Sequence, residues 1–324
     1  MKRFVHAVTA IAFTVLAAGV SAQTYPSKPV RIVVPYTAGG PADALVRGLG
    51  MKLGEKWGQQ IVVDNRPGAN EIVAAEHVAK QPADGYTFLL ASDAVYTLNG
   101  YLYSKLPYDP VKDFTPVTKL VTANLLLVTR PDFPANSVKE FIEEVRRNPG
   151  KYSYGSVGAG GVNHLAMSWF NSVNGLKMEH IPYKGLVQGL QDIVTSRLDA
   201  MFAVIGGALP FIQSNKLKSL AVSGKTRTAV IPNVPTFAEV GYPSFDASFY
   251  FAVAAPAGTP PDIVRKFATD ASEIVNSKEF TDKYLANLGF EPAGPNTPEQ
   301  FATFLVTDRK LAADKVKVSG AKLD

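Results

Sequence analysis

Two glycine-rich loops carry the residues of this chain that are best suited to bind a ligand. The first follows the apolar run from Val30 to Val34 and reads ProTyrThrAlaGlyGlyProAlaAsp over residues 35–43. A helix that opens in such a loop leaves several backbone N–H groups unpaired at the positive end of its dipole. That end suits a carboxylate or another anion. We therefore interpret the loop as one half of a ligand site.

The second loop spans residues 154–164, where a short apolar strand gives way to Ser156 and several glycines before a new helical pattern. Two such loops, separated by about the length of a domain, suggest two α/β lobes that face one cleft. Taken alone, each loop also fits an ordinary connection between a strand and a helix.

Several catalytic interpretations fail on sequence grounds. No nucleophile-elbow pattern surrounds Ser156, and a histidine satisfied at the start of a helix is the simpler interpretation of His164. His77 falls in a helical pattern and His180 in a strand, without the spacing of a metal site. Residues 155–160 lack the GxGxxG spacing of a dinucleotide-binding loop. We assign no catalytic residue, metal or cofactor, and expect that the protein is not an enzyme.

The N-terminus predicts export. Lys2 and Arg3 precede an apolar run from Val8 to Val20, and ValSerAla at 20–22 has the small residues that a signal peptidase recognises. We place cleavage after Ala22 and expect a periplasmic protein. No other segment approaches the length of a membrane span.

Composition excludes further classes. The 324 residues include no cysteine, which excludes disulfides, thiol catalysis, cysteine-ligated metals and a lipid-modified cysteine. Removing the predicted signal peptide leaves 31 basic against 28 acidic residues, so the formal charge falls from +5 to +3. The basic residues are scattered, so we expect no nucleic-acid binding. A mild positive field still favours anionic ligands.

Strands and helices alternate along the chain. Apolar runs predict strands at residues 30–34, 61–64, 87–91, 125–129, 152–155, 179–182, 200–203, 217–223 and 248–254. A capping box at Ser137 and Glu140 predicts one helix start, and ThrProGluGln at 297–300 predicts another. The alternation predicts mainly parallel sheets with helices on both faces. We expect the chain to cross between lobes at 123–129 and 249–255.

Short segments distributed from Tyr25 almost to the C-terminus carry a family resemblance. They are TyrProSerLysProValArgIleValValPro at 25–35, AlaGlyGlyProAlaAsp at 38–43, AspAsnArgProGlyAla at 64–69, AlaAspGlyTyrThr at 83–87, LeuProTyrAspProValLysAspPhe at 106–114, AsnProGlyLysTyrSerTyrGlySer at 148–156, ProTyrLysGly at 182–185, ValProThr at 234–236 and AlaProAlaGlyThrPro at 255–260. In this order the chain resembles the Bug, or TctC-like, family of periplasmic solute-binding proteins associated with tripartite tricarboxylate transporters.

The resemblance implies a Venus-flytrap fold, in which two α/β lobes with doubly wound sheets are joined by two crossing strands. It implies a signal peptide at 1–22, one lobe from 23–124 plus 250–324, the other from 125–249, and a ligand cleft between them. We expect ligand-binding residues at Tyr36, Thr37, Ala38, Gly39, Asp43, Ser92, Ser156, Gly158, Ala159, Gly160, Gly161, Asn163, His164, Tyr183 and Ala203. Because Asp43 is a poor partner for a carboxylate, we favour a role in capping the helix or orienting loop amides.

Three departures from the family pattern bear on the ligand. Pro41 and Ala42 replace a common glycine and threonine, and residues 67–72 read ProGlyAlaAsnGluIle where relatives often read ProGlyAlaGlyGlyAsn. Ala203 stands where relatives commonly carry an aspartate, so an ammonium group would lose a partner. We hypothesise a non-amino dicarboxylate, aliphatic or aromatic, such as a phthalate-type acid. A neutral substitution outside the pocket would explain Ala203 equally well.

We therefore expect a monomeric binding protein that delivers a small carboxylate to a permease with one large and one small membrane subunit. A binding protein that reports its ligand to a membrane sensor uses the same fold, and a periplasmic hydrolase is the alternative of another class.

Overall fold

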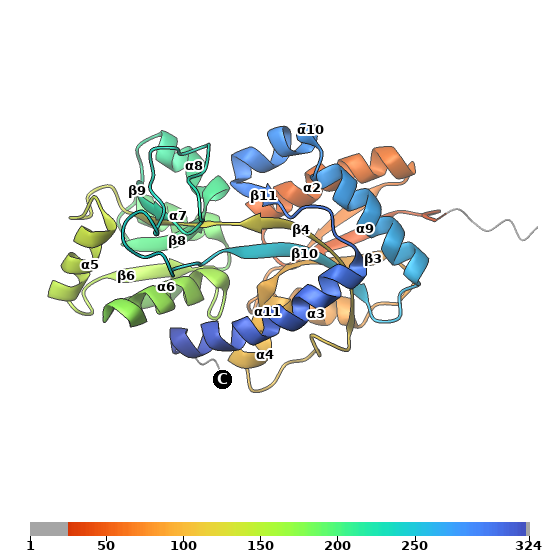
Figure 1. Ribbon diagram of the computed structural model, residues 1–324, viewed down its shortest axis with the longest axis horizontal. Coiled ribbons are helices and arrows are strands. Elements are labelled where there is room, and N and C mark those ends of the chain that lie inside the picture. The colour runs from red at the N-terminus through yellow and green to blue at the C-terminus, as the bar shows by residue number, and fades with distance from the viewer. Residues whose placement is uncertain (1–24, 322–324) are drawn as a thin grey trace, which may run out of the picture.

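Two sheets form the framework of the computed structural model, which describes residues 25–321 (Figure 1). In spatial order the first sheet contains β11 (Phe290–Pro292), β4 (Phe114–Ala123), β10 (Phe249–Pro256), β3 (Thr87–Ser92), β1 (Val30–Val34) and β2 (Ile61–Asn65). The second contains β7 (Glu179–Pro182), β6 (Ser153–Ser156), β8 (Ala200–Val204), β5 (Leu125–Thr129) and β9 (Lys218–Val222). The signal peptide and its cleavage after Ala22 lie outside the described residues.

The two-lobed α/β fold is confirmed, but the sheets are mixed rather than mainly parallel. β1 is parallel to β2 and β3, and β6 is parallel to β7 and β8. β10 is antiparallel to β3 and β4, β11 is antiparallel to β4, and β5 is antiparallel to β8 and β9. The reason is the connection between lobes: β4 leads out of the first sheet and β10 leads back into it, so neighbouring connecting strands must run in opposite directions.

The strands that cross between the sheets are largely buried. β4 ends at Ala123 and β5 begins at Leu125, with only Asn124 between the two sheets. All residues of β5 and β10 are buried. Each fully buried Leu, Val or Phe in them contributes roughly 1.5–3 kcal/mol. The lobes are thus joined by rigid strands, which limits their relative motion to a hinge.

Helices cover both sheets. In chain order they are α2 (Pro41–Trp57), α3 (Ile72–Ala79), η1 (Ala94–Leu98), α4 (Asn99–Leu102), α5 (Val138–Arg147), α6 (Val162–Asn174), α7 (Leu186–Val194), α8 (Ile205–Gln213), α9 (Pro261–Val275), α10 (Lys278–Phe280), η2 (Thr281–Leu285), η3 (Ala286–Leu288) and α11 (Pro298–Ser319). The predicted starts of α5 and α11 are confirmed, because Ser137 and Thr297 cap these helices with their side chains. No helix within residues 25–321 is long and apolar enough to cross a membrane.

The C-terminal helix α11 contacts both halves of the molecule. It packs on β4 and η1 on the side of the first sheet, and on α6 on the side of the second (Figure 1). Phe301 and Leu305 anchor its first half in a buried cluster with Tyr96 and Tyr250. The helix therefore lies along the hinge beside the crossing strands.

Candidate ligand-binding cleft

Three helices begin at one cavity between the two sheets. The N-terminal caps of α2, α6 and α7 are Gly40, Gly161 and Gly185, and none of these helices has a side-chain cap. This cavity, which we call the helix-end cavity, has an empty volume of about 500 Å³. It is lined by Tyr36, Thr37, Gly40, Pro41, Ala42, Val157, Val162, Asn163, Gly185, Leu186, Val187, Val204, Phe249 and Phe251.

The helix-end cavity is suited to hold an anion. The first turn of an α-helix has N–H groups without intrahelical partners, and its dipole carries about half a positive charge at this end. Elsewhere Ser137, Ser277 and Thr297 satisfy such groups at α5, α10 and α11, but a glycine cap leaves them open. Apolar side chains such as Phe249 and Phe251 line the cavity, and a low local dielectric strengthens the attraction.

A second, more polar cavity adjoins the first. It shares Tyr36, Val157, Val162 and Asn163 with the helix-end cavity, and its empty volume is about 720 Å³. The other residues that line it are Pro35, Gly68, Ala69, Asn70, Glu71, Tyr103, Gly158, Ala159, Gly161, Tyr183 and Lys184. We call it the Glu71 cavity.

Asp43 holds the loop of the first lobe. Its Oδ2 accepts hydrogen bonds from the Gly39 backbone N–H at 2.9 Å and from Arg47 Nε at 2.8 Å, and its Oδ1 accepts one from Asn65 at 3.0 Å. Burial works against ionisation, but these donors hold the pKa of Asp43 below its usual value. Asp43 lines neither cavity, and its geometry matches the expected role in orienting loop amides.

Glu71 was not among the predicted site residues, yet its carboxyl group lies at the centre of a buried network. It accepts hydrogen bonds from the hydroxyl of Tyr36, the hydroxyl of Ser92 and the backbone N–H of Ser92, the last at 2.9 Å. Burial raises the pKa of Glu71, while the donors from Ser92 and Tyr36 oppose that shift. The predicted residue Ser92 therefore supports Glu71 and does not line either cavity. The glutamate in place of a glycine was the available sequence signal.

Two histidines support the loop of the second lobe. His164 Nδ1 accepts a hydrogen bond from the Gly160 backbone N–H at 3.0 Å, and its ring stacks on His180 with 4.1 Å between centroids. His180 Nε2 lies 2.7 Å from Ser156 Oγ, which also donates to the Gly158 carbonyl at 2.9 Å. Burial, reinforced by His180, lowers the pKa of His164 to about 4. Both rings are therefore neutral at pH 7 and hold the loop that precedes α6.

The Ser156–His180 pair does not extend to a catalytic triad. Asp199, the carboxylate that follows on the neighbouring strand, accepts hydrogen bonds from Arg130 and Ser153. Ser156 is fully buried. Within residues 25–321, no group of three His, Cys, Asp or Glu residues could hold a metal ion.

Residues of the two lobes touch across the cleft. The hydroxyl of Tyr103 donates to the Ala159 carbonyl at 3.2 Å. A methyl group added to Gly185 would lie 2.7 Å from Thr37 Oγ1. One added to Gly206 would lie 2.5 Å from the Cα of Leu288. The two lobes are thus in contact, and glycines allow backbone from one lobe to approach the other.

The structure brings many predicted residues to the cleft but not all. Those that line a cavity are Tyr36, Thr37, Gly158, Ala159, Gly161, Asn163 and Tyr183. Those in or beside the loops that line neither cavity are Ala38, Gly39, Asp43, Ser92, Ser156, Gly160 and His164. Ala203 is 0% exposed within β8 and lines neither cavity. Ala203 therefore does not mark a lost partner for an ammonium group in either cavity, and the neighbouring Val204 lines the helix-end cavity instead.

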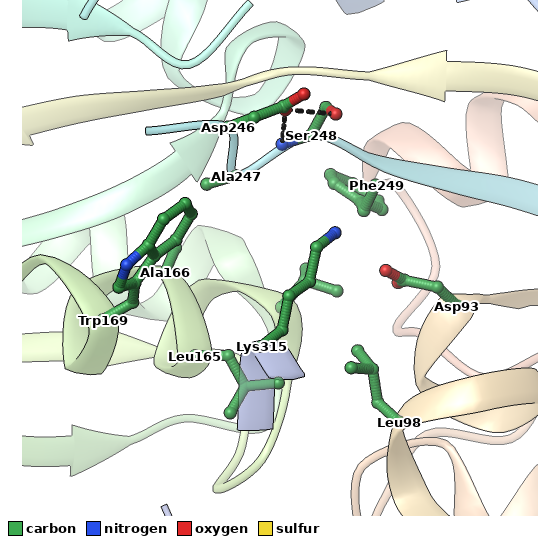
Figure 2. Close-up of a pocket in the computed structure, with 11 residues that line it drawn as sticks. Asp93, Leu98, Leu165, Ala166, Trp169, Asp246, Ala247, Ser248, Phe249 and Lys315 are labelled. Carbon is green, nitrogen blue, oxygen red and sulfur yellow. Dashed lines mark hydrogen bonds between the residues drawn. The ribbon is translucent and has the colours of Figure 1, made fainter. Parts of the chain in front are cut away.

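A third cavity lies beside the start of β10, as Figure 2 shows. Asp93, at the start of η1, and Lys315, on α11, both point into it, and Asp246 accepts two hydrogen bonds from Ser248 at its rim. Asp93 Oδ1 is buried without a hydrogen-bond partner among the described residues, and burial raises the pKa of Asp93 to about 8. We call this space the hinge cavity. It shares Val162 and Phe249 with the helix-end cavity.

Comparison with known proteins gives consistent matches. Residues 45–320 match the model of the family described as the tripartite tricarboxylate transporter family receptor. Protein BugT of Bordetella pertussis is 35% identical over 97% of this chain and 96% of its own. A solved structure of R. palustris Rpa4515 with adipate is 33% identical, with a TM-score of 0.88 over 92% of this chain and 100% of its own. MatC from Rhodopseudomonas palustris with bound malate is 29% identical, with a TM-score of 0.84 over 90% and 100%.

Proposed function

Because this chain belongs to the tripartite tricarboxylate transporter receptor family, we propose that it captures a small carboxylate in the periplasm and delivers it to a two-subunit membrane permease. Export would follow from the predicted signal peptide, cleaved after Ala22. The observation that carries carboxylate binding is the meeting of three glycine-capped helix N-termini at one apolar cavity. The adipate and malate bound by two relatives support the same ligand class.

The proposed mechanism is closure around the ligand, which involves no chemistry on it. In the open form the carboxylate binds the amides at the start of one helix, and closure adds those from the other lobe. We place the lobes at 23–124 plus 250–324 and at 125–249, with the hinge at the crossing strands. Since closed-state contacts such as Tyr103–Ala159 form only when the lobes meet, ligand binding shifts the population toward closure. A monomer suffices for this cycle.

The ligand class is proposed more broadly than the sequence suggested. The preference for a non-amino dicarboxylate rested on Ala203, which is buried away from both cavities. We therefore propose a small carboxylate as the ligand. The residues that line the Glu71 cavity then determine which second functional group the ligand carries.

A thermal-shift screen of the purified mature protein tests carboxylate binding. Mono-, di- and tricarboxylates, aromatic acids and amino acids are each compared with the corresponding amide, because a ligand selective for the folded state raises Tm. We expect selective shifts from acids but not from their amides. Equal shifts from an acid and its amide would show that the helix ends do not recognise the charge.

Delivery to a permease is separable from ligand sensing. Deletion of the gene for this protein in a host that grows on the identified acid should abolish uptake of the labelled acid if the role is transport. Normal uptake together with a lost transcriptional response would favour the sensing alternative.

The Ser156–His180 hydrogen bond is the one observation that favours a hydrolase. Steady turnover of an ester of the bound acid, abolished by Ser156→Ala, would be needed to support that alternative. We expect no turnover, because Ser156 is fully buried and donates to the Gly158 carbonyl.

A further inference from the structure

Glu71 is the acidic residue among those that line the ligand cleft. It lines the Glu71 cavity although it is only 5% exposed, and its carboxyl group is bonded to Tyr36, which lines the same cavity. Oε1 accepts from the hydroxyls of Tyr36 and Ser92, and Oε2 accepts from the Ser92 backbone N–H. A carboxylate offers about four acceptor positions, and the described residues supply donors to three of them, two on Oε1 and one on Oε2.

The backbone around Glu71 is strained in a way that fixes this carboxyl group. Ala69, Asn70 and Glu71 all adopt positive φ angles, of 46°, 50° and 71°. Non-glycine residues in this region cost roughly 1–2 kcal/mol each. The turn is held by Asn70 and Asn99, since Asn70 Nδ2 donates to Asn99 Oδ1 at 2.7 Å and Asn99 Nδ2 donates to the Asn70 carbonyl at 3.2 Å. Strain concentrated beside a cavity points to a functional role.

The hydrogen-bond pattern decides which groups can approach Glu71. The Tyr36 hydroxyl already donates to Glu71, as does that of Ser92, so neither is open to a ligand carboxylate. Burial raises the pKa of Glu71, and the three donors oppose this shift by stabilising the ionised form of the carboxyl group. The other charged side chain that lines this cavity is Lys184, which is exposed. A second ligand carboxylate at this position would meet a like charge in a partly desolvated space.

Building on the proposed function, we propose that Glu71 determines specificity. With its carboxylate at the ends of α2, α6 and α7, the ligand extends into the Glu71 cavity and donates a hydrogen bond from a hydroxyl or ammonium group to Glu71. A dicarboxylate of the same length is disfavoured there by repulsion. The ligand class is therefore a hydroxy- or amino-monocarboxylate rather than a simple diacid.

Isothermal titration at pH 7.5 with matched acids tests this assignment. The four-carbon probes are succinate, 4-hydroxybutanoate, 4-aminobutanoate and butanoate, and the six-carbon probes are adipate and its three counterparts. The variants are Glu71→Gln, which keeps the shape but removes the charge, and Glu71→Gly, which removes the side chain and relieves the positive φ. Glu76→Gln on the outer part of α3, where Glu76 pairs with Lys80, is the matched control.

We expect the wild type and Glu76→Gln to bind the hydroxy acid or the amino acid at least about tenfold more tightly than the diacid of equal length. A tenfold ratio in affinity is the scale of one hydrogen bond to a charged group. In Glu71→Gln and Glu71→Gly the diacid should gain affinity and this ratio should fall toward one. The probe that shows the largest ratio in the wild type identifies the donor group, which is an ammonium group if the amino acid binds most tightly and a hydroxyl group if the hydroxy acid does.

A wild-type preference for the diacid, or the same ratio in Glu71→Gln as in Glu76→Gln, would overturn the role of Glu71 while leaving carboxylate binding intact. If no acid bound the wild type, the proposed function itself would fail, and this inference with it. Because both Glu71 variants are compared by affinity ratios, a general loss of stability cannot mimic the expected change.

Discussion

The hydroxyl of Tyr103 donates a hydrogen bond to the backbone carbonyl of Ala159 at 3.2 Å. Tyr103 follows α4 on the side of the first sheet, and Ala159 belongs to the glycine-rich loop that precedes α6. Both residues line the Glu71 cavity. The bond thus joins the lobes at the mouth of the cleft, where closure and ligand binding are coupled.

Removing this hydroxyl should weaken the closed state. Tyr103→Phe loses the hydrogen bond to Ala159 between the lobes, worth about 0.5–1.5 kcal/mol, together with one to Asn70, so we expect at least a two- to tenfold rise in the Kd of the bound acid. Isothermal titration measures the change. Tyr101→Phe, at an exposed tyrosine of the preceding helix α4, is the control and should bind as the wild type does.

A methyl group at Gly206 should hold the lobes apart. It would lie 2.5 Å from the Cα and 2.9 Å from the carbonyl carbon of Leu288. Backbone atoms cannot rotate out of the way, so Gly206→Ala should raise Kd by about tenfold or more, because only the closed population binds tightly. Small-angle X-ray scattering should show a larger radius of gyration for Gly206→Ala than for the wild type.

The matched control for that variant is Gly100→Ala on α4, where an added methyl group meets nothing within 4 Å. Unchanged affinity in both variants would show that the Gly206–Leu288 approach plays no part in closure.

Acid should destabilise the protein through His164. The pKa of His164 is about 4 in the folded state, against 6.5 for an ordinary histidine, because of burial and the neighbouring His180. The folded state therefore binds fewer protons, and the stability that His164 contributes is complete above pH 6.5 and is lost as the pH falls toward 4. The loss amounts to about 3 kcal/mol at most.

Urea unfolding of the wild type and of His164→Asn between pH 4 and 7.5 measures this effect. Asparagine does not titrate, so the variant should show a smaller slope of unfolding free energy against pH. Equal slopes would mean that protonation of His164 does not disturb the Gly160 contact.

Asp93 should act in the opposite direction. Burial raises its folded pKa to about 8 from 3.8, with Lys315 opposing the shift. The folded state binds more protons between these two pKa values. The stability that protonated Asp93 contributes is therefore complete below pH 4 and declines as the pH rises toward 8, by roughly 1.4 kcal/mol per pH unit at most. Asp93→Asn should remove this decline and stabilise the protein most at pH 8–9.

Thermal unfolding from pH 5 to 9 tests the prediction, with Asp246→Asn at an exposed position of the same hinge cavity as the control. A wild-type decline that persisted unchanged in Asp93→Asn would place the titrating group elsewhere.

The sequence was informative where local chemistry is decisive. The loops at Gly40 and Gly161 could be identified as helix starts open to an anion, because glycine without a capping side chain is visible in one sequence. Ser137 and Thr297 could be identified as capping residues because their side-chain type and position before a helical pattern are also visible in one sequence. The family resemblance then extended these local features to a two-lobed fold.

Features that depend on tertiary approach could not be predicted. The direction of β10 follows from the return of the chain between lobes, which no local pattern records. The outward or inward orientation of Ala203 depends on how both faces of β8 are covered. Glu71 lines the cleft from a turn with positive φ angles that Asn99 holds by a hydrogen bond to the Asn70 carbonyl.

A crystal structure of the complex with the acid that gives the largest thermal shift tests the central claim most directly. We predict that one ligand carboxylate lies within hydrogen-bond distance of first-turn N–H groups of α6 or α7 and of α2, with the lobes closed as at Tyr103 and Ala159. A carboxylate bound away from all three helix ends, for example on surface lysines, would contradict the account.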